Sequence, residues 1–214
     1  VRTPAFPLAP GSVVGRSIDY ALYTSLSALA GIAAQRPEVV LAIAPPLSAG
    51  LSGGVIGGLR QAPFVFNVQD IWPDGLIRMG KLRHRSLIRS AAGLERFTYR
   101  RARKVVVLSD GMRDNLIHKG VPAQKIAVLP NWVDLSAFRA GEKDNAFRSE
   151  LGLEDAFVVL FAGNLGFASG LETILGAADL LRQEAIVFLL VGEGSAKAEA
   201  MRLAVDAGRK AFRA

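Results

Sequence analysis

The sequence predicts an α/β protein built on parallel β-sheets, arranged in two doubly wound units that are each incomplete. Six short runs rich in Val, Ile and Phe have the continuous apolar character of parallel strands covered on both faces, and helical segments alternate with them. At residues 157–172 and again at 185–194, an apolar run leads into a glycine-containing loop and then a helical segment. This repeated pattern is typical of nucleotide-binding α/β domains.

The elements follow from local patterns. We expect strands at residues 39–44, 64–68, 104–108, 126–129, 157–162 and 186–191, and helices at 47–59, 82–103, 111–119, 171–181 and 197–207. A further apolar stretch, residues 20–34, is shorter than the roughly twenty residues of a membrane-spanning helix and contains Thr24, Ser25 and Ser27. It is predicted to be a buried or interfacial helix.

The domain boundary is expected near Ala140, which gives units at residues 1–140 and 141–214. Residues 134–155 are polar, carry both charges and contain no candidate strand, so we expect a linker or a helix there. Only two strands follow this segment, too few for a complete α/β domain, and the first strand starts only at residue 39. The chain is therefore interpreted as a piece of a longer protein, poorly soluble when expressed alone because its strand edges are uncovered.

Composition excludes several classes of site. The 214 residues include no Cys and two His, which excludes disulfides, thiolate metal sites and a His-rich metal site. The formal net charge is +7. Between residues 75 and 104, ten Lys or Arg residues stand against one acid, Glu95.

The predicted helix at 82–103 carries an arginine stripe within an arc of about 60°. The members of this stripe are Arg85, Arg89, Arg96, Arg100 and Arg103. Leu87, Ala91, Leu94 and Thr98 fall roughly opposite, so the helix suits an anionic membrane surface or a lipid-phosphate acceptor. The alternatives are a solvated basic face and a nucleic-acid site, and the second is disfavoured because aromatic residues are not interleaved.

Polar residues follow the strand at residues 64–68. Gln69 and Asp70 come first, and Trp72 stands two residues further on. Side chains at the carboxyl end of a parallel strand face the crevice where ligands bind. Asp70 could therefore orient a substrate hydroxyl or act as a general base, and Trp72 could stack on a sugar ring. The alternative is that Asp70 caps the following turn and Trp72 packs in the core.

The loop after residue 162 is expected to bind an anion. Glycine allows close backbone approach, and the following helix presents unpaired N–H groups and the positive end of its dipole. In the alternative interpretation, these glycines merely terminate buried strands.

Three segments of the chain are VQDIWPDGLI, RRARKVVVLSDGMRDNLIHKGVPAQKIAVLPNWVDLSAF, and FAGNLGFASGLETIL followed by VGEG. Together they resemble the family 4 (group 1) glycosyltransferases of GT-B fold. The resemblance is strongest to bacterial enzymes of colanic acid, O-antigen and exopolysaccharide biosynthesis. It implies two Rossmann-like domains, the first for a polyprenyl-linked or saccharide acceptor and the second for a nucleotide-sugar donor. It also implies retention of anomeric configuration, no metal or cofactor, and peripheral attachment at the cytoplasmic face of the plasma membrane.

The resemblance assigns roles by position. Asp70 and Gln69 fall at the acceptor-side catalytic strand end, and residues 131–134 fall near the interdomain hinge. The residues expected near the donor are Gly163, Asn164, Leu165 and Gly166 at the diphosphate, Gly192, Glu193 and Gly194 near the nucleotide, and Lys197 as a helper.

This chain departs from the family pattern at the donor loop. Asn164 and Ser169 stand where many relatives have arginine and lysine, and the family's paired glutamates are expected after Ala214. We therefore expect this piece to be inactive alone. The alternatives are a nucleotide-sugar epimerase of related fold and a non-enzymatic basic membrane-binding module.

Overall fold

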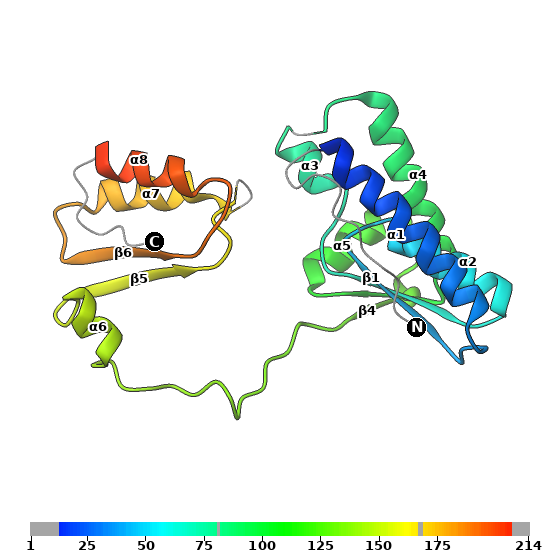
Figure 1. The fold of residues 1–214 in the computed structure, drawn as a ribbon, viewed down its shortest axis with the longest axis horizontal. Helices are drawn as coiled ribbons and strands as arrows, with labels where there is room; N and C mark the ends of the chain where they lie inside the picture. The colour runs from blue at the N-terminus through cyan, green and yellow to red at the C-terminus, as the bar shows by residue number, and fades with distance from the viewer. Residues whose placement is uncertain (1–12, 81, 167–168, 207–214) are drawn as a thin grey trace. The chain divides into compact units, whose positions relative to one another are not determined.

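The computed structural model describes residues 13–80, 82–166 and 169–206, and the chain divides into two compact units (Figure 1). Unit 1 is Val1–Val133 and unit 2 is Asp134–Ala214. The division falls a few residues before the predicted boundary at Ala140.

Unit 1 contains a parallel sheet of four strands in the order β1-β2-β3-β4. Its strands are β1 (Val40–Ala44), β2 (Phe64–Val68), β3 (Lys104–Val107) and β4 (Ile126–Val128). All four predicted strands are confirmed to within one residue at each end. The carboxyl ends of the strands therefore share one edge of the sheet and the amino ends share the other.

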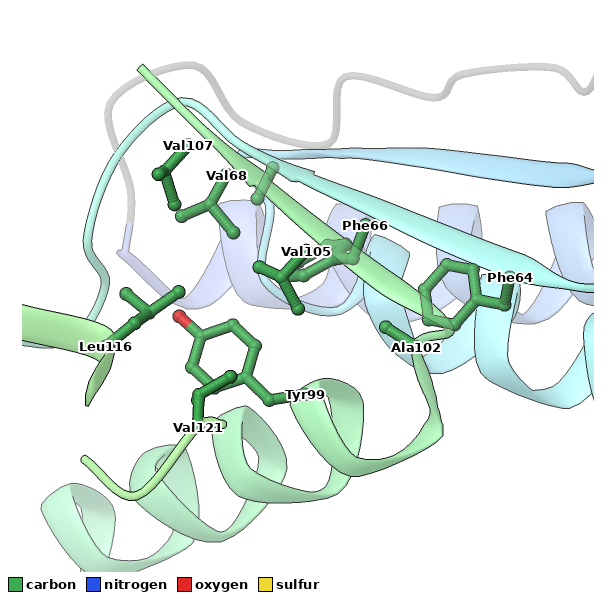
Figure 2. Close-up of a cluster of buried hydrophobic side chains, with 10 residues drawn as sticks. Phe64, Phe66, Val68, Tyr99, Ala102, Val105, Val107, Leu116 and Val121 are labelled. Carbon is green, nitrogen blue, oxygen red and sulfur yellow. The ribbon is translucent and has the colours of Figure 1, made fainter. Parts of the chain in front are cut away.

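Three helices cover one face of this sheet, namely α2 (Ala49–Arg60), α4 (Arg85–Arg101) and α5 (Asp110–His118). Figure 2 shows the core beneath them, where Phe64, Phe66, Val105 and Val107 from the sheet meet Tyr99 of α4. The glycine-rich sequence of α2 allows close packing here. A Cβ on Gly53 would lie 2.4 Å from Cε2 of Phe64, so a side chain at that position would displace the helix from the sheet.

The opposite face of the sheet is open at β1. Leu41 and Ile43 point away from the core and are 59% and 51% exposed. Parallel sheets normally have both faces covered. The described part of unit 1 is thus the incomplete α/β unit that the sequence predicts.

Helix α1 (Val13–Ala33) starts earlier than predicted and packs on α2. The Ser27 hydroxyl donates to Oγ of Ser52 at 3.0 Å, which ties the two helices together. Thr24 is buried, but Leu29 is 65% exposed, so the predicted burial holds for one side of the helix only. Among the helices that the structure describes, none has the combined length and hydrophobicity needed to cross a lipid bilayer.

Smaller elements connect the larger ones. The short helices α3 (Asp74–Arg78) and η1 (Ala123–Lys125) lie in unit 1 and were not predicted. In unit 2, α6 (Ala146–Leu151) occupies the segment predicted as a linker or a helix, and the Asn145 side chain caps its amino end.

Unit 2 is built on a parallel pair of strands, β5 (Phe157–Ala162) and β6 (Ile186–Val191). Both strands are confirmed as predicted. Helices α7 (Leu171–Leu180) and α8 (Lys197–Asp206) pack side by side against this pair (Figure 1). The core between them is formed by Leu165, Leu171, Leu175, Leu190, Ala196 and Ala200.

Candidate active site

The carboxyl edge of the unit 1 sheet carries a hydrogen-bonded group of amide side chains. Gln69, directly after β2, donates from Nε2 to Oδ1 of Asn67 at 2.9 Å. Its Oε1 accepts from Nδ2 of Asn131, which follows β4, at 3.0 Å. Both ends of the Gln69 side chain are therefore engaged, and Gln69 is placed to position Asn131 and the strand exits.

Asp70 stands beside this group with an exposed carboxylate. The carboxylate makes no hydrogen bond or ion pair with any residue that the structure describes. The turn that follows is closed by the main chain, with the Trp72 N–H donating to the Asp70 carbonyl at 3.1 Å. Because Trp72 is 39% exposed and Asp70 does not cap the turn, the structure contradicts the capping-and-core alternative.

A partly buried ionic network in unit 1 was missed at the level of sequence. The Lys119 ammonium contacts Oδ1 of Asp74 and Oε1 of Glu95, each at 2.8 Å. The Tyr99 hydroxyl donates to the same Glu95 oxygen at 2.9 Å, and Asn115 donates to Oδ2 of Asp74 at 3.1 Å. The network joins α3, which follows the Asp70 turn, to α4 and the end of α5.

The ionisation of this network follows from its contacts. Burial raises the pKa of Asp74, but the hydrogen bonds from Lys119 and Asn115 outweigh it, so the pKa is lowered overall. Burial and the neighbouring Glu95 carboxylate raise the pKa of Tyr99, which stays protonated and donates. One feature of the sequence could have indicated this network: Glu95 is the one acid in the basic segment at residues 75–104.

The arginine stripe is shorter than predicted. Arg85, Arg89, Arg96 and Arg100 are exposed on α4. Arg103 is not on the helix, because α4 ends at Arg101 and the backbone is extended at Ala102.

The face of α4 expected opposite the stripe is also partly wrong. Thr98 is buried as that face requires, but Leu87 is 57% exposed, and Glu95 and Tyr99, which were not expected on this face, are buried. The helix is therefore rotated so that the stripe borders the core. On the buried side, Glu95 contacts the Lys119 ammonium and accepts a hydrogen bond from the Tyr99 hydroxyl.

The loop after β5 does not form the predicted open cradle of amides. The Gly163 N–H donates to the Val191 carbonyl at 2.9 Å, and the Leu165 N–H donates to the Glu193 carbonyl at 2.8 Å. The Gly166 N–H donates to Oγ of Ser169 at 3.3 Å. Among the four amides of residues 163–166, only that of Asn164 lacks a partner within the described residues. The other three amides already have acceptors within the protein, and the binding of a diphosphate by this backbone stays a prediction.

The glycines instead allow the loops after β5 and β6 to pack backbone against backbone. A Cβ on Gly192 would lie 1.8 Å from the Gly163 carbonyl oxygen, and one on Gly194 would lie 2.4 Å from the Leu165 carbonyl oxygen. No side chain fits at either position. Leu165 is completely buried in the unit 2 core, which excludes its side chain from ligand contact.

Side chains complete the closure of these loops. Ser169, at the position where many relatives have lysine, donates to the Asn164 carbonyl at 2.5 Å. The Lys197 ammonium contacts Oε1 of Glu193 at 2.6 Å. The predicted helper cation therefore has an acidic partner. Among the described side chains, no group of three or more His, Cys, Asp or Glu is arranged to hold a metal ion.

Comparisons with known proteins agree with this architecture. Residues 1–132 match the family described as glycosyl transferase 4-like domain, and these residues coincide with unit 1. The chain belongs to this glycosyltransferase family.

Individual relatives extend the similarity into unit 2. WcaI of Escherichia coli (strain K12), provisionally named a colanic acid biosynthesis glycosyl transferase, is 30% identical over 179 residues, which are 81% of this chain and 44% of WcaI. WbjE of Pseudomonas aeruginosa, provisionally named a glycosyltransferase, is 26% identical over 164 residues, 76% of this chain and 41% of WbjE. The chain thus spans less than half the length of the curated relatives that it matches.

The fold is shared with a solved structure from Anabaena. Anabaena Alr3699/HepE, crystallised in complex with UDP-glucose, superimposes with a TM-score of 0.67 at 19% identity, over 94% of this chain and 53% of HepE. The α/β class with incomplete parallel sheets is confirmed, and it is of GT-B type.

Proposed function

We propose that the complete protein is a retaining glycosyltransferase of surface-polysaccharide biosynthesis. It moves a sugar from a nucleotide-sugar donor to a polyprenyl-linked or saccharide acceptor. In this proposal, unit 1 is the acceptor side and unit 2 is part of the donor side. The observation that carries the proposal is that the family match covers unit 1, whose sheet presents at its carboxyl edge the Asp70 carboxylate, unpaired among the described residues.

Asp70 is assigned to the acceptor hydroxyl. An exposed carboxylate without a competing partner can accept a proton from that hydroxyl or orient it for attack. Gln69 is a positioning residue, because both ends of its amide are already bonded to Asn67 and Asn131. Trp72, partly exposed beside Asp70, offers an aromatic face to a sugar ring.

The donor is assigned to the carboxyl ends of β5 and β6. That HepE was crystallised with UDP-glucose supports a nucleotide sugar as the donor class. In unit 2, two groups are suited to a diphosphate. One is the Asn164 amide, which has no partner within the described part of the chain, and the other is Lys197, once its ammonium exchanges Glu193 for phosphate. Developing negative charge on the leaving diphosphate would be stabilised by these donors and by residues outside this chain.

Attachment to the cytoplasmic face of the membrane is assigned to α4. The exposed cations of Arg85, Arg89, Arg96 and Arg100 lie on one side of this helix. Each cation near an anionic surface contributes on the order of 1 kcal/mol, and the attraction weakens with salt. An enzyme bound to the membrane surface would encounter a lipid-linked acceptor by diffusion within the plane of the membrane.

The activity test uses the complete protein with a panel of labelled nucleotide sugars, with and without polyprenyl-phosphate acceptors. Asp70→Asn is expected to lower the transfer rate by roughly 10²- to 10⁴-fold, the range for loss of a positioned acid or base. Asp144→Asn removes the same charge from an exposed site and should leave the rate unchanged. Equal rates in both variants would reject the role of Asp70.

The stereochemistry of the product separates the finer alternatives. NMR of the isolated product is expected to show the donor's anomeric configuration. An inverted anomer would contradict the retaining mechanism. Epimerised nucleotide sugar formed without acceptor would favour the epimerase, although both curated relatives are named as transferases.

Vesicle sedimentation tests the membrane assignment. The variant R89E/R96E/R100E is expected to lose binding to vesicles that contain phosphatidylglycerol, while wild-type binding weakens as salt is raised. Binding retained by the triple variant would remove the stripe from the proposal.

A further inference from the structure

A basic pocket lies at the amino-terminal edge of the unit 1 sheet, away from Gln69 and Asp70. It has a volume of about 640 Å³. Its walls come from the end of α2 and from the segments that lead into β2, β3 and β4. Because β2 has five residues of about 3.3 Å each, the two edges of the sheet lie roughly 16 Å apart. The pocket is therefore separate from the proposed acceptor site.

The pocket is lined by cations that have no counter-ion among the residues the structure describes. Its charged residues are Arg100, Arg101, Arg103, Lys104 and Lys125, and none of the described lining residues is acidic. The guanidinium groups of the three arginines have no hydrogen-bond or ion-pair partner among the described residues. Concentrated unpaired charge of one sign is costly unless an anion neutralises it.

Main-chain contacts fix the two lysines at the rim. Lys104 Nζ donates to the Gln124 carbonyl at 2.9 Å, and Lys125 Nζ donates to the Arg100 carbonyl at 2.8 Å. The Arg101 guanidinium lies over the Phe97 ring, 5.7 Å from its centroid, which restrains that side chain as well. The cations are thus partly ordered in the absence of a ligand. Burial lowers the pKa of Lys125.

Glycines of α2 keep the pocket open. Gly54, Gly57 and Gly58 form one wall and contribute no side chains to fill it. A Cβ on Gly58 would lie 3.9 Å from Nη2 of Arg101, so a larger side chain there would enter the space beside the guanidinium. The arrangement combines an open volume with convergent donors, as small-molecule sites do.

We propose that this pocket binds a compact phosphate-bearing anion, such as a diphosphate group, through Arg100, Arg101 and Arg103. Planar guanidinium groups match phosphate oxygens with paired hydrogen bonds. A single carboxylate would neutralise only one of the five cations, whereas a diphosphate carries several charges within one pocket. The group can belong to a soluble metabolite or to a lipid head group.

Calorimetric titration of the full chain with inorganic pyrophosphate tests the site. The variant R101Q/R103Q is expected to bind about tenfold more weakly or worse, because two charge-assisted contacts are lost. The matched control R85Q/R89Q removes the same charge from α4 outside the pocket and should change affinity by less than about twofold. Equal weakening in both variants, or no saturable binding by the wild type, would overturn the proposal.

A second variant preserves all charges. Gly58→Leu should block pyrophosphate binding by filling the pocket, and its helical position should tolerate leucine. Unchanged affinity in a folded Gly58→Leu protein would also overturn the site. Asp70→Asn should leave binding intact, so failure of this site and failure of the proposed catalytic role are distinguishable.

Competition identifies the source of the phosphate. Vesicles containing phosphatidylglycerol are added to the pyrophosphate titration of wild type and Gly58→Leu. Displacement of pyrophosphate from the wild type assigns a lipid head group to the pocket. Undisturbed binding assigns a soluble phosphate compound.

Discussion

The loops that follow the strands differ between the two units in whether their polar groups are already hydrogen-bonded. In unit 1, side chains define the edge of the sheet, and Asp70 keeps a carboxylate without a partner among the described residues. In unit 2, main-chain groups define it, and the amides of Gly163 and Leu165 donate to carbonyls of the neighbouring loop. A glycine-rich loop after a strand therefore does not guarantee free donors, because glycine also lets two loops pack together.

The largest effect is expected from Gly192→Ala, which tests the closed loops of unit 2. The new Cβ would meet the Gly163 carbonyl oxygen. This backbone atom cannot move without disrupting the packing of the loops that follow the paired strands β5 and β6. We expect a loss of about 3 kcal/mol in the free energy of unfolding, at the upper end for overpacked sites. Urea unfolding followed by circular dichroism measures it.

Gly176→Ala is the control for that experiment. Gly176 lies within α7, and a Cβ there would meet nothing within 4 Å. Alanine should stabilise the helix by about 0.5–1 kcal/mol. If Gly192→Ala were as mild as Gly176→Ala, the two loops would not be in contact.

Lys119→Met tests the ionic network of unit 1 and is expected to have a similar or slightly smaller effect. It leaves Glu95, which is 3% exposed, without its cation. Removing one partner of a buried pair costs about 3 kcal/mol. Tryptophan fluorescence during urea unfolding reports on this unit, since Trp72 and Trp132 both belong to it.

Arg36→Met provides the matched control, because Arg36 is an exposed cation of unit 1, the unit on which the fluorescence reports. Its effect should stay within about 0.5 kcal/mol. Similar midpoints for both methionine variants would mean that Lys119 does not hold the network together.

The smallest effect is expected from acid. The pKa of Asp74 is lowered on folding from its ordinary value of 3.8, so its stabilising contribution is complete above that value. The contribution is lost as pH falls below 3.8 toward the folded-state pKa. Between pH 5 and pH 3, wild type should lose more stability than Asp74→Asn, which has no carboxylate to protonate. Parallel losses in thermal melts of both proteins would contradict this assignment.

The sequence predicts the strands well because their signal is local. Apolar runs bounded by proline or glycine locate β2, β5 and β6 at the predicted residues. It also places Gln69 and Asp70 correctly at a strand exit. Because the strands pair in parallel, their carboxyl ends must lie at the same edge of the sheet.

Contacts between distant residues could not be predicted in this way. The partner of Glu95 is Lys119, 24 residues later, so an acidic side chain that was not expected in the core is 3% exposed. The acceptors for the Gly163 and Leu165 amides come from the loop after β6. Neither contact has a periodic signature, and each changes which groups are free to bind a ligand.

Residue-resolved amide hydrogen exchange by NMR tests the contrast between the two strand exits most directly. The amides of Gly163 and Leu165 should be protected without any ligand, and that of Asn164 should exchange fast. Addition of UDP-glucose should leave the protection of the first two unchanged. Rapid exchange of Gly163 and Leu165 that slows only when the nucleotide sugar binds would contradict the closed loop and restore an open main-chain cradle.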